Sequence, residues 1–451
     1  RTPEHPNART HEPTPMLLPI LYHYIRALAG PGVRGRAALR AWQDERVRRH
    51  LRRVVPRSRF YARHYAGERL DEWRALPLVE KGTLMAEFDA WNTVGVRRDE
   101  AMAAALRGEE SRDFAPTVRG ITVGLSSGTS GKRALFLASA AERQAWAGTI
   151  LAKLLPAPIW VAQRIAFFLR ANSTLYQSVA SRHLRFEYYD LLAPLEAHVE
   201  RLNRLQPTIL IAPPAMLRLL ADAPALHIAP RRVISVADVL DPQDERRIAQ
   251  RFEQPVHQVY QATEGLLGAS CRLGTLHLAE DVVAVQGEPV DVATGRIMPI
   301  LTDFRRTSQP ILRYRLDDVL ALRRDPCACG SPFLALARIE GRCDDLFWLP
   351  DGRDGALRPI FPDALRRAMM IAAPEVATYR VRQLDRDRVE VALLAPPADA
   401  ERAVRAALDR LWAAVGVAPP TLAFVPAEPP DPARKERRVE RLWQGIEGGA
   451  P

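Results

Sequence analysis

Apolar residues recur along this chain with two different spacings. Residues 16 to about 112 read as mostly helical, with a proline-punctuated link inside them. From residue 120 to about 278, short apolar runs such as RIAFFL, TILIAPP and RRVISVADVL alternate with amphipathic, helix-like segments such as DPQDERRIAQRFE. This alternation is typical of layered α/β folds and predicts such a domain.

The pattern changes after GRCDD, residues 341–345. Before it, RYRLDDVLAL and PFLALARIEG predict a β-rich region that ends the large domain. After it, residues 377–396 alternate like a hairpin, residues 399–416 have a helical pattern, and residues 420–426 read as another strand. We therefore predict a large domain over residues 16–341, a hinge at 342–345 and a small, mobile α+β domain over 346–451.

Composition places the chain among ordinary globular proteins. It has 451 residues, of which 47% are hydrophobic and 26% charged, enough for two or three domains. The net charge of +11 could indicate nucleic acid, a membrane surface or an acidic partner, but the arginines are spread along the chain, so a bias toward arginine codons is the favoured explanation. No basic stripe interleaved with aromatic residues is present, so we predict no nucleic-acid binding.

The cysteines and the N-terminal segment bear on location. Four cysteines, all late in the chain, are too few and too clustered for a secreted disulfide scaffold, so we expect a reducing, cytoplasmic environment. The apolar stretch of residues 16–30 is too short to span a bilayer, which predicts a packed helix and no membrane span. Residues 1–15 are polar and proline-rich, so we expect a disordered leader, with Met16 as a plausible start.

The stretch LSSGTSGKRALF, residues 125–136, is the first candidate for chemistry. Small residues let the backbone approach closely, so a Gly/Ser/Thr-rich loop after the β-like run GITVGL suits a polyphosphate. The Walker pattern fails, because it requires glycine at Ser126 and serine or threonine at Arg133. A flexible surface linker is the alternative. Lysine occurs at only four positions among 64 basic residues, and one of them, Lys132, is in this loop.

Four further stretches accompany the loop. In VYQATEG, Tyr260 could stack on a base and Glu264 could hold Mg²⁺. RYRLDDVL contains adjacent acids that could bind a ribose, GRCDD lies at the domain boundary, and ARKERRVERL places Lys435 in a basic segment. Each also has a structural interpretation: a core tyrosine, helix-capping acids, and a solvated helix.

In this order, SSGTSGKR, YQATEG, RYRLDD and GRCDD resemble the motifs of the adenylate-forming superfamily of acyl-CoA synthetases and nonribosomal adenylation domains. The chain is most similar to the branch with phenylacetate–coenzyme A ligase and the capsule-biosynthesis-type adenylate-forming enzymes. The resemblance covers most of the chain, from LPLVEKGTLMAEFDAWN to KERRV.

The resemblance implies a role for each matching residue. The ATP phosphates would be wrapped by Ser126, Ser127, Gly128, Thr129, Ser130, Gly131 and Lys132. Further ATP or AMP contacts would come from Asp238 in SVADVL, Tyr260 beside the adenine, Gln261, and Asp318 on the ribose. Catalytic positions would be Thr263 at the α-phosphate, Glu264 on Mg²⁺, Arg342 before the hinge, and Lys435, with Asp344 as the hinge residue.

Two positions depart from the family pattern. Asp317 replaces the usual glycine before the ribose aspartate, adding a negative charge that either weakens ATP binding or takes over the contact. Arg434 replaces the usual glycine before Lys435. Of the other lysines, Lys81 lies in a segment that this branch also shows, and Lys153 reads as a surface lysine on a helix.

A zinc site is predicted from CRLGTLH and CACG. Three thiolates and an imidazole suit tetrahedral Zn²⁺, although buried free cysteines and a core histidine are the alternative. Some proteins similar to phenylacetate–coenzyme A ligase bind zinc with such an arrangement, which favours a closed, structural site. The ligands would be Cys271, His277, Cys327 and Cys329.

The resemblance implies an ATP- and Mg²⁺-dependent enzyme that converts a carboxylic acid, aromatic or small and hydrophobic, to acyl-AMP and pyrophosphate. The acyl group would pass to a thiol, either coenzyme A or the phosphopantetheine of an acidic carrier protein. One alternative is transfer to an amine or hydroxyl. Another is a regulator that binds nucleotide without catalysis, which would not need Lys435.

Overall fold

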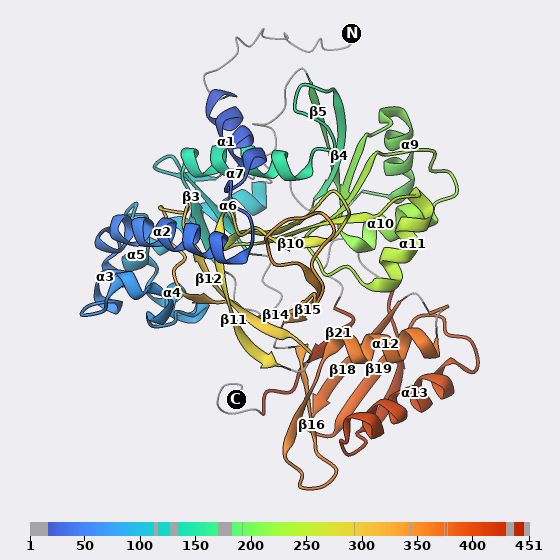
Figure 1. The fold of residues 1–451 in the computed structure, drawn as a ribbon. Helices are drawn as coiled ribbons and strands as arrows, with labels where there is room; N and C mark the ends of the chain where they lie inside the picture. Colours follow the sequence, from blue (N-terminus) through green and yellow to red (C-terminus); the bar gives the residue numbers. More distant parts are fainter. Residues whose placement is uncertain are drawn as a thin grey trace.

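A computed structural model of the chain describes residues 17–111, 116–126, 134–169, 183–191, 193–292, 294–342, 345–373, 375–376, 378–429 and 437–445. Helices and strands form a large domain and a smaller C-terminal domain, coloured orange to red at the lower right of Figure 1. Within the described residues, no helix is both long and apolar enough to cross a membrane.

Residues 17–111 are mostly helical, as their spacing predicts. They form α1 (Leu17–Ala29), α2 (Arg36–Val54), α3 (Arg59–His64), α4 (Lys81–Ala86), α5 (Phe88–Trp91) and α6 (Arg98–Ser111), with short 3₁₀ turns at Val55–Arg57 and Leu70–Ala75. The predicted packing of the helix over residues 16–30 is confirmed for one face of α1 and wrong for the other. Ile20 and Tyr24 of α1 are buried toward α7 (Ala140–Leu154), whereas Leu18, Tyr22, Ile25 and Leu28 are exposed.

A seven-stranded sheet forms the centre of the large domain. Its order is β10-β9-β8-β7-β6-β4-β5, and the five strands from β8 to β5 pair in parallel, as βαβ units require. The strands are β4 (Gln163–Leu169), β5 (Leu184–Asp190), β6 (Ile209–Ala212), β7 (Arg232–Ser235), β8 (Val256–Ala262), β9 (Gly265–Ser270) and β10 (Leu276–Leu278), with α9 (Leu195–Leu205), α10 (Pro214–Asp222) and α11 (Pro242–Phe252) between them.

Two antiparallel sheets complete the large domain. A three-stranded sheet contains β1 (Thr117–Val118), β2 (Ile121–Leu125) and β3 (Leu135–Ala138). The predicted β-rich region forms β11 (Val283–Asp291), β12 (Arg296–Asp303), β13 (Tyr314–Arg315), β14 (Asp318–Leu322) and β15 (Leu336–Arg342). One hydrophobic cluster joins these two sheets to the N-terminal helices.

The C-terminal domain has its own hydrophobic core, built from residues 347–439. The predicted hairpin is β18 (Tyr379–Asp385) paired with β19 (Arg388–Leu393), and the predicted helix and strand are α13 (Ala400–Val415) and β20 (Thr421–Pro426). The remaining elements are β16 (Phe347–Pro350), β17 (Leu357–Ile360), α12 (Pro362–Ala372) and β21 (Val439–Arg441), which extends the sheet beside β18. The end of the basic segment is therefore a strand, and the helical alternative for it is wrong at these residues.

Candidate active site

One large cavity, of about 830 Å³, opens where the parallel strands β6, β7 and β8 end. Ligands of α/β proteins bind at the carboxyl ends of parallel strands, because the loops that follow neighbouring strands meet there. The C-terminal domain contributes Arg366, Arg437, Arg438 and Val439 to its lining. Residues of both domains therefore line the cavity.

The segment SVADVL follows β7 and lines this cavity. Its Ala237 has a left-handed backbone, with φ of 70°, a conformation that costs free energy in residues other than glycine. Val236, Ala237, Asp238 and Val239 all line the cavity. This strained segment, for which the resemblance implies a nucleotide contact through Asp238, therefore forms part of the cavity lining.

An acidic turn joins β8 to β9. Ala262 pairs with Gly265, so Thr263 and Glu264 are the two residues of a tight turn at the end of β8. Glu264 is 9% exposed, and it accepts hydrogen bonds from the hydroxyls of Tyr314 (2.7 Å) and Thr263 (2.9 Å). Arg306 fixes the turn by donating to the Thr263 carbonyl at 2.7 Å. Burial, and then the charge of Glu264, raise the pKa of Tyr314, so this tyrosine remains a donor.

Tyr260 and Asp318 meet on the same cavity wall. The Tyr260 hydroxyl donates to Asp318 Oδ2 at 2.5 Å, joining β8 to the start of β14. Asp317 also lines the cavity and is exposed, so two adjacent carboxylates face the space where an aromatic ring is available. This arrangement can accept hydrogen bonds from the two hydroxyls of a ribose beside a stacked base.

The glycine- and serine-rich loop is described only at its ends. Ser126 lines the cavity and makes two hydrogen bonds with Ala134. Its N–H donates to the Ala134 carbonyl, and its hydroxyl accepts from the Ala134 N–H, both at 2.8 Å. The two residues that flank the loop, Ser126 and Ala134, are therefore held together, with Ser126 at the cavity. Ser127, Gly128, Thr129, Ser130, Gly131 and Lys132 lie outside the described residues, as do Cys343, Asp344 and Lys435, and the side chain of Arg342 is likewise not described.

Glu142, which sequence reasoning missed, holds the surroundings of the loop together. It caps α7 by accepting from the Ser139 N–H and hydroxyl, each at 2.8 Å. It also accepts from the Thr307 and Ser308 N–H groups (2.6 and 2.8 Å) and the Ser308 hydroxyl (2.6 Å). Burial opposes its ionisation, but these donors outweigh burial and lower its pKa to about 2. The Ser-x-x-Glu spacing predicts only the cap.

Replacing Glu142 with glutamine should lower the free energy of unfolding at pH 7 by about 2–3 kcal/mol, because folding lowers the pKa of this carboxyl to about 2. Because the folded pKa lies below the unfolded one, this stabilisation is present above pH 4.5 and is lost as pH falls toward 2. Urea titrations at pH 7, 5, 4 and 3 measure it. Glu45→Gln, in an exposed pair with Arg49, is the control and should change stability by less than about 0.5 kcal/mol. If the difference in unfolding free energy between Glu142→Gln and the unchanged protein stayed the same as the pH was lowered, this explanation would be contradicted.

Two of the lysines are described, and they differ. Lys81, at the start of α4, lines the cavity on the side of Thr263 and Glu264. Lys153 is no surface lysine, contrary to expectation. Its side chain is 16% exposed, and its ammonium donates to both carboxylate oxygens of Asp281 at 2.9 and 3.1 Å. Lys153 therefore supports the structure, whereas Lys81 is available to a ligand.

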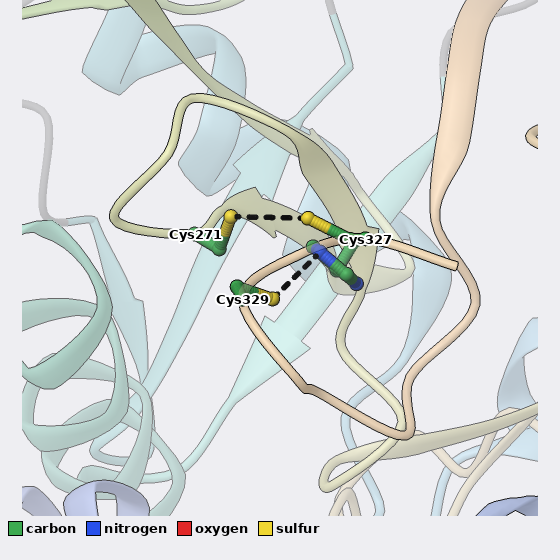
Figure 2. Close-up of side chains that lie close together, drawn as sticks. Cys271, Cys327 and Cys329 are labelled. Carbon is green, nitrogen blue, oxygen red and sulfur yellow. Dashed lines mark hydrogen bonds between the residues drawn. The ribbon is translucent and has the colours of Figure 1, made fainter. Parts of the chain in front are cut away.

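The predicted zinc ligands lie together (Figure 2). Cys271 follows β9 and His277 lies in β10, whereas Cys327 and Cys329 come from the loop between β14 and β15. All four ligand atoms lie within 4.8 Å of one another, with Cys271 Sγ 3.9 Å from Cys327 Sγ and Cys329 Sγ 3.4 Å from His277 Nε2. His277 Nδ1 lies 3.2 Å from the Phe333 carbonyl oxygen, which leaves Nε2 toward the sulfurs.

The thiol chemistry of this cluster suits a cation. A hydrogen bond with the Thr275 side chain lowers the pKa of Cys327 to about 6, whereas burial and the neighbouring sulfurs raise the pKa of Cys329 to about 11. One thiolate thus forms readily, and a second is opposed by the first. A divalent cation removes that opposition, so the four side chains fit a tetrahedral metal ion.

Comparison with known proteins places the fold. No family model matches the sequence, and no curated protein matches it. A 2-hydroxyisobutyryl-CoA ligase in its postadenylation state, in complex with R3-HIB-AMP, is similar with a TM-score of 0.68 and 18% identity, over 90% of this chain and 89% of that chain. The amide bond synthetase McbA from Marinactinospora thermotolerans is similar with a TM-score of 0.54 and 16% identity, over 92% and 97% of the two chains.

These likenesses confirm the predicted fold class. The chain has the α/β fold of adenylate-forming ligases, a large domain plus a small C-terminal one. The same 2-hydroxyisobutyryl-CoA ligase in its thioesterification state reaches a TM-score of only 0.52, at 19% identity and 89% coverage of each chain. Of these two structures of the ligase, the postadenylation structure therefore has the higher TM-score with this chain.

Proposed function

We propose that this protein uses ATP to adenylate a carboxylic acid and then transfers the acyl group to a thiol. The observation that carries the proposal is the single cavity that joins Tyr260 and Asp318 to the Thr263–Glu264 turn, at the carboxyl ends of parallel strands and under the C-terminal domain. One end suits a nucleoside, and the other suits its phosphates and their Mg²⁺. The fold of adenylate-forming ligases supports the same reading.

In the first half-reaction, the substrate carboxylate attacks the α-phosphorus of ATP, forming a P–O bond while pyrophosphate leaves. Asp318 and Tyr260 would orient the ribose and adenine, and Thr263 would donate to the α-phosphate. Mg²⁺ held by Glu264 would neutralise charge on the phosphates. Lys81, Lys132 and Lys435 would supply cations, with Lys435 approaching the charge that develops at the α-phosphate and carboxylate.

In the second half-reaction, the acceptor sulfur attacks the acyl carbon, AMP leaves with the bonding electrons, and the thiol proton is released. The acceptor would be coenzyme A or a carrier-protein phosphopantetheine, since the net charge of +11 attracts either anion. Arg342 and Asp344 would lie at the hinge between the two arrangements. An amine acceptor is the second candidate, favoured by the likeness to an amide bond synthetase.

The cavity wall indicates the class of acid. Apolar side chains from α7, from the central strands and from the segments that follow β6 and β7 line it: Trp146, Phe167, Pro213, Pro214, Val236, Val259 and Leu266. A wall of this kind stabilises an aromatic or small hydrophobic group by removing its surface from water. We therefore propose an aryl or short hydrophobic acid as the substrate.

Exchange of labelled pyrophosphate into ATP tests the first step directly. With a panel of aryl and aliphatic acids, we expect exchange that requires both an acid and Mg²⁺ and that one acid class supports best. Incubation of that acid with coenzyme A, a phosphopantetheinylated carrier or an amine then separates the acceptors by mass spectrometry of the product. ATP binding without exchange for any acid would instead support a nucleotide-binding regulator.

A further inference from the structure

Four charged side chains are buried where the C-terminal domain meets the large domain. Arg438, just before β21, is 6% exposed, and its Nη2 donates to both carboxylate oxygens of Asp244 at 3.0 and 3.2 Å. Its Nη1 lies 3.3 Å from Asp241 Oδ2. Nη1 of Arg218, in α10, lies 3.4 Å from Asp244 Oδ2. Two arginines and two aspartates thus form a buried network of zero formal net charge.

The network is divided unequally between the domains. Asp241 caps α11 by accepting from the Gln243 N–H at 2.9 Å, and Asp244 lies in the first turn of the same helix. Arg218 also belongs to the large domain, so its contact with Asp244 would survive separation of the domains. Arg438 is the member that comes from the C-terminal domain, where its guanidinium lies 5.2 Å from the centre of the Tyr379 ring.

The position of the network connects it to the cavity. Asp241, Asp244 and Arg438 all line the cavity wall, close to the SVADVL segment. In the sequence, Arg438 follows Lys435 by three residues. Whatever fixes Arg438 against α11 therefore restricts where the preceding lysine can lie.

We propose that Arg438 is a positioning residue whose ion pairs with Asp241 and Asp244 hold the C-terminal domain in the adenylating arrangement. The catalytic consequence rests on the proposed adenylation, whereas the conformational one does not. A contact present in one arrangement shifts the population toward it by its differential free energy. When the domains separate, water replaces Arg438 at both carboxylates, and α11 retains Arg218 as a partner.

The structure also explains why arginine is needed here. A planar guanidinium reaches two carboxylates at once and lies over an aromatic ring, whereas an ammonium is a single point charge. Removing the guanidinium leaves Asp241 and Asp244 buried, with Arg218 still paired to Asp244. Opening of the domains hydrates these carboxylates, so the loss of Arg438 favours the open arrangement.

The test compares Arg438→Met and Arg438→Lys with Arg382→Met. Arg382 pairs with Glu390 inside the C-terminal domain, so its loss leaves the interdomain contact intact. Probes attached at the exposed positions Glu196 on α9 and Arg402 on α13 report the interdomain distance by pulsed spin-label measurements. Pyrophosphate exchange and single-turnover acyl transfer from preformed acyl-AMP report the two half-reactions.

We expect Arg438→Met to shift the distance distribution toward longer distances and to slow exchange at least tenfold, with acyl transfer changed less than threefold. Arg438→Lys should fall between it and the unchanged protein, and Arg382→Met should match the unchanged protein. An unaltered distance distribution in Arg438→Met, or equal losses in both half-reactions, would overturn the proposal. Absence of exchange in the unchanged protein would refute the proposed function, while the distance measurement would still decide the role of Arg438.

Discussion

Replacing Glu264 with glutamine is expected to slow acid-dependent pyrophosphate exchange by about a hundredfold or more, a loss typical of removing one preorganised charge from a reaction centre. The structure supplies the reason. Both carboxylate oxygens are held by hydroxyl donors, from Tyr314 at 2.7 Å and Thr263 at 2.9 Å, so the carboxylate is fixed before any ligand arrives. Glutamine keeps the size but loses the negative charge that Mg²⁺ prefers, and its amide nitrogen faces a donor.

The measurement is the dependence of exchange on Mg²⁺ concentration, with Glu196→Gln, an exposed change on α9, as the control. The control should behave as the unchanged protein does. For Glu264→Gln, we expect a lower maximal rate together with a requirement for more Mg²⁺. Equal exchange in the two variants, with both proteins folded, would show that this carboxylate does not hold the cation.

Removing metal from the cysteine–histidine cluster is expected to lower the unfolding temperature by roughly 10 °C, because structural Zn²⁺ contributes directly to folding free energy. The four side chains connect the β9–β10 hairpin to the loop between β14 and β15. Without a cation, three sulfurs within 4.8 Å of one another no longer share a positive centre. β9 of this hairpin begins directly after the Thr263–Glu264 turn. Loss of the metal should therefore also slow pyrophosphate exchange.

Elemental analysis of the purified protein should find one zinc ion per chain, and a chelator should remove it with the loss of thermal stability. Cys329→Ser should reproduce that loss, because a hydroxyl is a poor zinc ligand. Cys343→Ser removes the cysteine that is not among the predicted ligands and should leave the zinc content unchanged. A protein without zinc that unfolds at the same temperature after chelation would favour the alternative of buried free cysteines.

The spacing of apolar residues correctly predicted those helices and strands whose residues are close together in the sequence. The β18–β19 hairpin, α13 and β20 follow from alternating and helical spacing, and the four metal-binding candidates follow from residue type and motif. Glu142 could not be found this way, because its partners Thr307 and Ser308 lie 165 and 166 positions away in the sequence. Arg438 and Lys153 were hidden for a similar reason: their burial depends on acids brought to them by other elements, Asp244 and Asp281.

The tight turn after β8 has a consequence for the length of the motif around it. Tyr260 lies near the end of β8 and Glu264 is the second residue of the two-residue turn that follows, after which β9 pairs back along β8. One residue more or fewer would turn the carboxylate to the opposite face of the hairpin, away from Tyr314 and the cavity. In any redesign of this protein, the length of the YQATEG segment is therefore constrained more strictly than the identity of several of its residues.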